Sequence, residues 1–335
     1  MKKLPMLCAV VCVLACSQQE KSELSCNDSD LRGSLVVSVL HKENVTKAGA
    51  GYTEVLEVEK AEKKVTVMVF DKETGVLNAS KDMDATSEEC DFSIPVGEKT
   101  VWAVVNGPEL DDVVTLGQLE SIVDDLSLNS FLQEGLTMAG SEDCTVEAGT
   151  TVSPVIIVSR MVSRVVLRNV TCSLPAQYGK LKVDCIFLGD AFTKQTFGGG
   201  LSGKVNVAGY HDAEKTVPIG KNGVVGSCPE YLYASVGEFV NVQEEAALNR
   251  CLYCHPNDTQ EYTNMYILAT VGGRQYYYKV PLTKGLEANT TYSIDVEIMN
   301  IGESEPPVHD HDKGKVKAVI TVADWVPGDT YSAEI

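Results

Sequence analysis

Apolar and polar residues alternate with a period of two along most of this chain. The alternation begins at Leu35, Val37 and Val39, which share one face of a short segment. This is the pattern of a half-buried β-strand. Similar strand-like segments follow at residues 65–70, 101–105, 155–158, 165–167, 182–187, 231–236, 266–271, 276–280, 292–298 and 315–323. So many short strands with turn residues between them predict a mainly β protein of the sandwich type.

One segment has a helical period instead. Its apolar residues fall on one face of a helix at Leu116, Leu119, Ile122, Val123 and Leu126. Thr115 and Gln118 stand at its start with the spacing of a capping box, in which two side chains bond the free amides of the first turn. We therefore expect one helix in the first half of the chain, and a domain boundary near Ser159 and Arg160.

The N-terminal residues have the pattern of an export signal. Lys2 and Lys3 precede an apolar run from Leu4 to Ala15, which is shorter than the roughly 20 residues that span a bilayer. Small residues then lead to Cys16, as in the lipobox of bacterial lipoproteins. We expect residues 1–16 to be a lipoprotein signal peptide with Cys16 as the lipidated residue. An ordinary signal peptide with a chance cysteine is the alternative.

The charge of the chain limits its partners. Its 335 residues include 28 Lys and Arg against 47 Asp and Glu, a net charge of −19. Because affinity for phosphate depends on Lys and Arg, this balance argues against a nucleic acid as partner.

Three short motifs invite a chemical interpretation. Cys251, Cys254 and His255 match the C-x-x-C-H haem pattern, but their apolar neighbours predict a β-strand. Residues 309–312 alternate His and Asp, yet they follow two prolines in an acidic stretch that is typical of a solvated loop. Residues 276–278 are three tyrosines, which could stack on sugar rings or divide between core and surface. The sequence has no known catalytic motif, and we expect no enzyme activity, no cofactor and no metal.

Five segments together resemble a known family. They are Lys64–Phe70, Val96–Asn106, Thr115–Leu119, Leu286–Ile298 and Val319–Trp325. Their order and spacing are similar to those of the fimbrillins, the subunits of type V pili on Gram-negative anaerobes. The likeness covers nearly the whole chain after the signal peptide.

This resemblance implies two transthyretin-like β-sandwich domains in tandem, at residues 48–159 with the helix and at 160–335. It also implies that residues 17–47 are a tether and a removable first strand, with its apolar face at Leu35, Val37 and Val39. A trypsin-like protease would cut between Lys47 and Ala48, although the family usually has Arg there. A donor strand at about residues 313–335 would then fill the vacated groove of another subunit; its apolar residues are Val316, Ala318, Ile320, Val322 and Trp325.

The implied function is that of a structural stalk pilin, exported to the outer membrane through the lipid on Cys16 and then incorporated in a fimbrium on the cell surface. Its partners would be other copies of itself, other pilus subunits and the processing protease, and a contribution to adhesion is compatible with this role. Two alternatives stay open: an anchor or tip subunit of the same pilus, and a monomeric surface lipoprotein that binds glycans through Tyr276 to Tyr278.

Overall fold

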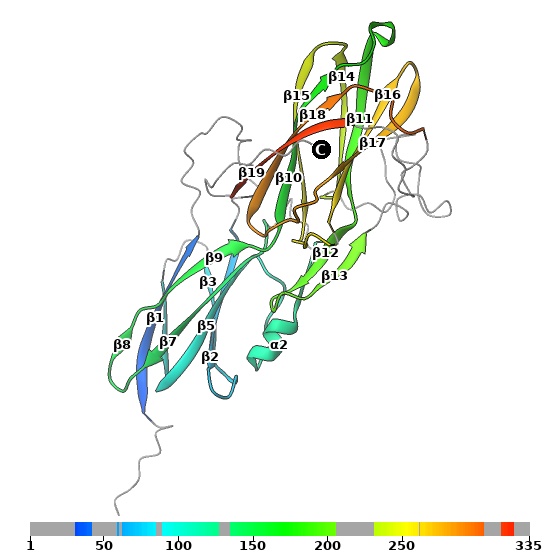
Figure 1. Cartoon of the computed structure of the whole chain (residues 1–335). Coiled ribbons are helices and arrows are strands. Elements are labelled where there is room, and N and C mark those ends of the chain that lie inside the picture. The colour runs from blue at the N-terminus through cyan, green and yellow to red at the C-terminus, as the bar shows by residue number, and fades with distance from the viewer. Residues whose placement is uncertain are drawn as a thin grey trace, which may run out of the picture.

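A computed structural model describes residues 31–41, 59, 62–84, 89–126, 135–205, 231–260, 262–304 and 316–324. Within these residues the protein is mainly β, as the alternation predicts (Figure 1). The first part of the chain forms one eight-stranded sheet, here called the N-terminal sheet. Most of the second part forms two four-stranded sheets, here called the C-terminal sandwich.

The N-terminal sheet has the strand order β3-β2-β5-β7-β9-β1-β4, with β8 beside β1. Its strands are β1 (Arg32–His41), β2 (Lys64–Asp71), β3 (Leu77–Asp84), β4 (Glu89–Pro95), β5 (Gly97–Val105), β7 (Met138–Val146), β8 (Thr151–Val152) and β9 (Val155–Arg160). The sheet curves around a buried apolar cluster to which β1, β2, β4, β5, β7 and β9 all contribute. The strands of this sheet lie in the lower left of Figure 1.

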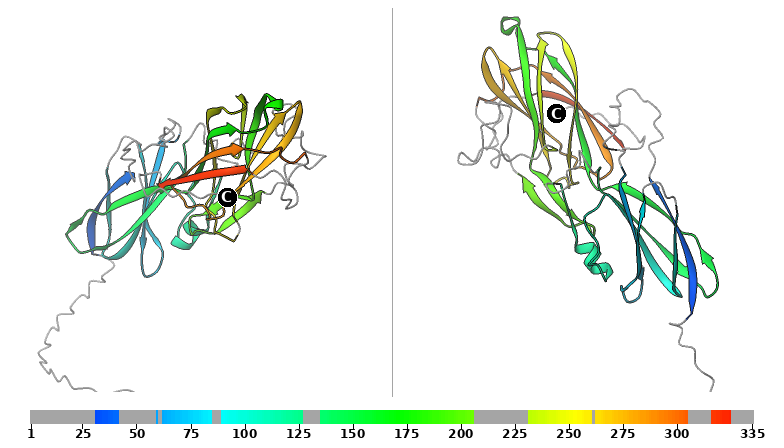
Figure 2. Two further views of the ribbon diagram at one scale, coloured as in Figure 1. Left: turned by 45° about the horizontal axis from the view of Figure 1, so that its top comes forward. Right: turned by 180° about the vertical axis from the view of Figure 1, so that it is seen from behind.

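Two residues separate β9 from the first strand of the C-terminal sandwich. One of its sheets has the order β15-β10-β18-β19 and the other β14-β11-β16-β17. Its strands are β10 (Ser163–Cys172), β11 (Lys180–Gly189), β14 (Tyr233–Asn241), β15 (Glu245–Cys254), β16 (Asn264–Val271), β17 (Arg274–Pro281), β18 (Thr290–Ile298) and β19 (Val316–Asp324). A short 3-10 helix, η2 (Ala176–Tyr178), lies between β10 and β11. The two sheets enclose the largest apolar cluster of the described residues, and Figure 2 shows them from two further sides.

A third, small sheet joins the two parts. It has the order β13-β12-β6, with β6 (Val123–Asp125), β12 (Ala191–Thr196) and β13 (Leu201–Val205). Because β6 comes from the first half of the chain and β12 from the second, their pairing ties the N-terminal sheet to the C-terminal sandwich. The boundary expected at residues 159 and 160 falls at the end of β9, just before the chain enters β10.

The predicted helix is present but shorter than its apolar period suggests. Helix α2 (Leu116–Ser121) begins at the N-cap Thr115, and the capping box with Gln118 is confirmed. The prediction that the helical face continues to Leu126 is wrong, because Ile122 is extended and Val123 enters β6. Pairing of β6 with β12 outweighs the local helical pattern there. Leu119 consequently packs in a cluster near α2, whereas Leu126 packs in the core of the C-terminal sandwich.

A buried lysine fixes the turn between β2 and β3. The side chain of Lys99, on β5, is 1% exposed, and its Nζ atom lies 2.8 Å from Oδ2 of Asp71. The hydrogen bond from Lys99 is the largest influence on the Asp71 carboxyl and lowers its pKa to about 2; further hydrogen bonds come from Thr74. A buried ammonium without its carboxylate leaves a costly unpaired charge, so this pair constrains the turn.

We expect Asp71→Asn to lower the free energy of unfolding by about 1–3 kcal/mol at neutral pH, because the buried Lys99 loses its counter-charge. The depressed pKa sets the sign of the pH dependence. The wild-type advantage is complete above the unfolded-state pKa of about 3.9 and is lost as the pH falls toward 2. Urea unfolding of both proteins at several pH values measures it. Equal stability at pH 7 would contradict this account.

Candidate functional site

The first strand lies inside the N-terminal sheet rather than at its edge. On one side β1 pairs antiparallel with β4, from Arg32 opposite Pro95 to Ser38 opposite Glu89. On the other side it pairs in parallel with β8 and then with β9. Removing β1 would therefore leave two strand edges with unpaired backbone groups facing each other. Exposed edges of this kind pair readily with another strand.

The same strand fills part of the core. Leu35 and Val37 are fully buried, and Val39 is half-buried against the same apolar cluster. The predicted inward face of the first strand is thus confirmed. Cys90 on β4 lies directly opposite Val37 and is also buried. Its burial raises the pKa of the thiol, which favours the protonated form while β1 is in place.

The predicted donor segment is the last described strand of the C-terminal sandwich. Val316, Ala318 and Ile320 of β19 are buried in its core, and Val322 is half-buried against it. This strand pairs with β18 alone, so it is an edge strand with one free side among the described residues. The alternation predicted from the sequence is confirmed, while a role as donor stays a prediction.

Several predicted sites lie outside the described residues. They are the lipidation site Cys16, the processing site Lys47 and Ala48, the donor residue Trp325, and the His-Asp stretch at 309–312.

A buried ionic cluster lies where the N-terminal sheet meets the C-terminal sandwich. Its centre is Glu59, which follows the connection from β1 and is fully buried. The Nε atom of Arg164, on β10, lies 2.8 Å from Glu59 Oε1, and the hydroxyl of Tyr253, on β15, donates to the same oxygen. Arg160, at the end of β9, donates from Nη2 to the Glu59 backbone oxygen at 2.8 Å. Glu59 therefore links its own segment to the consecutive strands β9 and β10 and to β15, at sequence separations of 101 to 194 residues.

The cluster has more positive than negative groups at its centre. Burial alone lowers the pKa of both arginines and the Glu59 carboxylate opposes this; the net direction is down for Arg160 and up for Arg164. Tyr253 has a raised pKa, first because of burial and then because of Glu59, so its hydroxyl stays a donor. One sequence signal marks this cluster: Arg160 and Arg164 are the charged residues in an otherwise uncharged run from 155 to 167.

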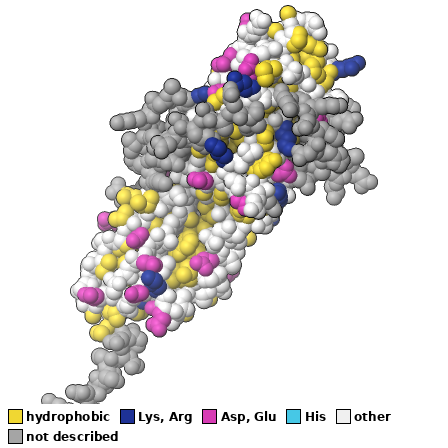
Figure 3. Space-filling model, viewed as in Figure 1, with side chains coloured by type: hydrophobic (Ala, Val, Ile, Leu, Met, Phe, Trp, Pro, Cys, Tyr) yellow, Lys and Arg dark blue, Asp and Glu magenta, His cyan; other side chains and the backbone are white. Residues whose placement is uncertain are grey.

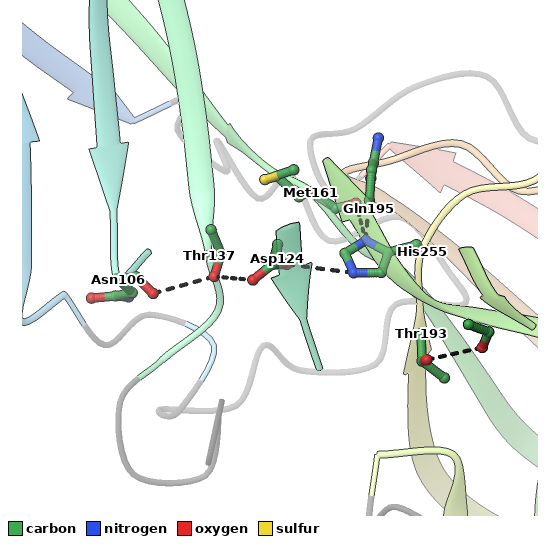
Figure 4. A network of polar contacts seen from close by, with 8 residues as sticks. Asn106, Asp124, Thr137, Met161, Thr193, Gln195 and His255 are labelled. Atoms are coloured by element: carbon green, nitrogen blue, oxygen red, sulfur yellow. Dashed lines mark hydrogen bonds and ion pairs between the residues drawn. The ribbon is translucent and has the colours of Figure 1, made fainter. Parts of the chain in front are cut away.

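A second polar network crosses the same junction (Figure 4). The Thr137 hydroxyl, just before β7, donates to Asp124 Oδ1 at 2.8 Å. The other oxygen of Asp124, on β6, lies 3.5 Å from Nε2 of His255. The opposite ring nitrogen of His255 is 3.1 Å from Gln195 Oε1 on β12 and 3.3 Å from the Met161 backbone oxygen. Asp124 and His255 are both buried, and burial lowers the pKa of His255 although Asp124 acts against it.

The second network accounts for the histidine of the C-x-x-C-H motif. Cys251 and Cys254 lie on β15, as the strand interpretation predicts, and residues three apart on a strand point to opposite faces. Cys254 is fully buried, which raises the pKa of its thiol to about 12. His255 faces Asp124. This arrangement presents no common face to a haem.

The three tyrosines on β17 do not form an exposed platform. Tyr277 and Tyr278 are buried in two different apolar clusters, and Tyr276 is half-buried. A stacking surface for sugars needs exposed ring faces, which the buried Tyr277 and Tyr278 lack. Among the described residues there is also no group of three or more His, Cys, Asp or Glu side chains that could hold a metal ion.

The described part of the chain contains no helix that is both long and apolar enough to cross a membrane.

Acidic side chains are scattered over the N-terminal sheet on the face shown in Figure 3, rather than gathered in one patch. The candidate functional site is the position of β1 between β4 on one side and β8 and β9 on the other, here called the β1 track. The Glu59 cluster and the Asp124–His255 network lie at the junction with the C-terminal sandwich.

Comparison with known proteins supports the fold. No protein-family model matches the chain. No curated protein sequence matches it either. Among solved structures, it is similar to a candidate cell adhesion protein from Parabacteroides distasonis, with 15% identity and a TM-score of 0.63 over 89% of this chain and 99% of that one. It is also similar to the fimbrilin FimA from Porphyromonas gingivalis, with 14% identity and a TM-score of 0.61 over the same shares of the two chains.

A third similar structure is a candidate cell adhesion protein from Bacteroides eggerthii, with 16% identity and a TM-score of 0.57 over 88% of this chain and 96% of that one. At such low identities the likeness establishes a shared fold and nothing finer. The resemblance to fimbrillins inferred from the sequence is confirmed at that level.

We expect Glu59→Gln to lower the free energy of unfolding by about 3–5 kcal/mol, because it removes the negative charge that faces two buried guanidinium groups. The matched control is Glu98→Gln on β5, an exposed glutamate 3.7 Å from Lys72, which should change stability by at most about 1 kcal/mol. Denaturant unfolding measures both. Equal effects of the two substitutions would show that the buried cluster contributes no more than a surface pair.

We expect acid to weaken the junction through His255. Because the pKa of His255 is lower in the folded state than in the unfolded state, the unfolded state binds a proton more readily. The free energy of unfolding therefore falls as the pH drops below about 6.5. His255→Gln should reduce this slope between pH 7 and 5. Thermal unfolding across that range measures it, and an unchanged slope in the variant would assign the acid sensitivity to other groups.

Proposed function

We propose that this protein is a structural, non-catalytic subunit of a type V pilus that polymerises by strand exchange. The observation that carries the proposal is the position of β1. It is the first described strand, it pairs on both sides, and it buries Leu35 and Val37 in the core. Proteolysis after β1 would open a groove that is apolar and has two free edges, and a strand from a second copy would fill it.

The energetics favour refilling the groove. Burying the equivalents of Leu35 and Val37 contributes about 3–6 kcal/mol of gross apolar stabilisation, before the cost of association. Backbone hydrogen bonds to both edges add to it, since an edge left unpaired and shielded from water is unfavourable. Because donor and acceptor surfaces lie on different parts of the subunit, the contact is head-to-tail and produces a filament.

The finer features of the proposal follow the resemblance to fimbrillins. The N-terminal sheet and the C-terminal sandwich are interpreted as tandem transthyretin-like domains, and the subunit as a stalk pilin. A lipid on Cys16 would hold the precursor at the outer membrane, and a trypsin-like protease would cut after Lys47. The mature subunit would then join the fimbrium at the cell surface. Support comes from the shared fold with a fimbrilin and with candidate cell adhesion proteins.

The glycan-binding alternative has less support. It was motivated by Tyr276 to Tyr278, and the burial of Tyr277 and Tyr278 removes the exposed aromatic surface on which it depended. An anchor or tip subunit differs from a stalk subunit in whether β1 leaves and whether a donor is presented, so the experiment on β1 also separates these roles.

We expect a disulfide between β1 and β4 to block polymerisation. Val37→Cys places a thiol opposite the native Cys90, and opposed residues of an antiparallel pair have Cα atoms about 4.5–5.5 Å apart, within reach of a disulfide. After trypsin treatment, wild type should form denaturant-resistant ladders on a gel. The oxidised variant should stay monomeric and form ladders once dithiothreitol is added.

The matched control is Val39→Cys. This residue is on the same face of β1 but lies beyond the last β1–β4 pair, which is Ser38 with Glu89, so its thiol has no partner on β4. It should polymerise with or without reductant. Intact mass establishes that the Val37→Cys disulfide has formed. If the locked protein then polymerises as wild type does, β1 does not have to leave and the proposal is wrong.

A further inference from the structure

Basic residues lie on both sides of Glu59 in the sequence. Two of them follow β1 and precede Glu59, and three more come directly after it: Lys42 and Lys47 before, and Lys60, Lys63 and Lys64 after. A trypsin-like protease that cut after any of the last three would remove Glu59 together with β1. The processed subunit keeps the centre of its buried ionic cluster only if these bonds are spared.

Glu59 fastens one end of the segment 59–64 to the body of the protein. Its carboxylate lies 2.8 Å from Nε of Arg164 and accepts a hydrogen bond from the Tyr253 hydroxyl. Its backbone oxygen accepts from Nη2 of Arg160 at 2.8 Å. All four residues are buried. Because proteolytic nicking concentrates in exposed chain, backbone that is buried and hydrogen-bonded in this way is a poor substrate.

Asn106, which directly follows β5, fastens the other end. Its side-chain oxygen accepts from the Lys63 backbone nitrogen at 2.9 Å, and its own backbone nitrogen donates to the Lys64 backbone oxygen at 2.9 Å. Asn106 is buried and has a φ of 52°, a conformation in which asparagine is enriched. Its backbone oxygen lies 3.2 Å from the Thr137 hydroxyl, which also bonds Asp124, so this contact continues the second polar network (Figure 4).

The lysine side chains themselves would not prevent cleavage. Lys63 is exposed. The ammonium of Lys64 forms surface pairs with Asp82 at 3.6 Å and with Glu109 at 3.3 Å, and such pairs contribute little. The backbone contacts at Glu59, Lys63 and Lys64 are therefore the barrier to a protease.

We propose that Glu59 and Asn106 set the C-terminal limit of the removable segment, because they hold residues 59–64 in a form that the processing protease cannot cut. Both are positioning residues, since they act on the backbone around the bonds and not on reacting atoms. This inference rests on the proposed function and goes beyond it by assigning the residues that stop the processing. Removal of β1 then leaves the carboxylate that faces Arg164 in place.

The limit is tested by mild trypsin treatment followed by intact mass measurement of the large product. Wild type should give a lasting product that begins at Glu43 or Ala48. In Glu59→Gln, cuts after Lys60, Lys63 or Lys64 should appear at least about tenfold faster, the effect of weakening one hydrogen bond to a charged group. Asn106→Gly should have a smaller effect in the same direction, since glycine keeps the positive φ and loses the side-chain contact.

Two controls separate local opening from unfolding. The matched variant is Glu109→Gln, which removes an exposed carboxylate that contacts the same segment and should leave the cleavage pattern unchanged. Cuts after Lys182, in the central strand β11, report loss of the whole fold, because this strand pairs on both sides. If Glu59→Gln is cut there at once, Asn106→Gly decides the outcome.

The results distinguish this inference from the function on which it rests. A wild-type product that begins at Ala61, Lys64 or Val65 while Lys182 stays uncut would overturn the inference. Unchanged cleavage rates in folded Glu59→Gln and Asn106→Gly would overturn it as well. Wild-type protein that is cut between β1 and Glu59 and forms no ladders would contradict the proposed function instead.

Discussion

The structure depends on the two-sided pairing of one short strand. β1 hydrogen-bonds to β4 along one edge and to β8 and β9 along the other, while Leu35 and Val37 close the core between the two halves of the sheet. A strand in such a position is essential to the fold and also replaceable. It supplies backbone hydrogen bonds to its two neighbours and a few side chains that fill pockets, and another strand can supply both. A replacing strand must fill the positions of Leu35 and Val37 with aliphatic side chains. It must also have no Cβ atom at the Gly33 position, where such an atom would lie 2.5 Å from the Glu147 backbone oxygen.

The junction behind this track is held by buried charge and polar groups rather than by apolar contact alone. Glu59 joins the segment after β1 to Arg160 and Arg164, and Asp124 joins β6 to His255. Buried polar networks of this kind tolerate few alternative geometries, because each displaced partner leaves a costly unpaired group. In the proposed mechanism the chain therefore keeps its N-terminal sheet fixed to its C-terminal sandwich when β1 leaves.

The sequence predicted what depends on local pattern. Strict alternation identified the inward faces of β1 and β19, and the Thr115–Gln118 capping box identified the start of α2. Prediction from the sequence failed where pairing with a distant segment decides the local structure. The predicted end of the helix is strand β6 instead, because β6 pairs with β12. Glu59 and His255 could not have been found by spacing, since their partners are 60 to 194 residues away in the chain. Arg160 and Arg164, the charged residues in the otherwise uncharged run at 155–167, were the one available hint.

The account is tested most directly by the N-terminus of the protein recovered from filaments on intact cells. Edman sequencing or mass spectrometry of that protein should show a chain that starts after β1 and before Glu59, so that the track is empty for a neighbour while the junction keeps its buried carboxylate. A filament subunit that still contains residues 32–41 would contradict the account, because the groove that is meant to join the copies would never have been opened.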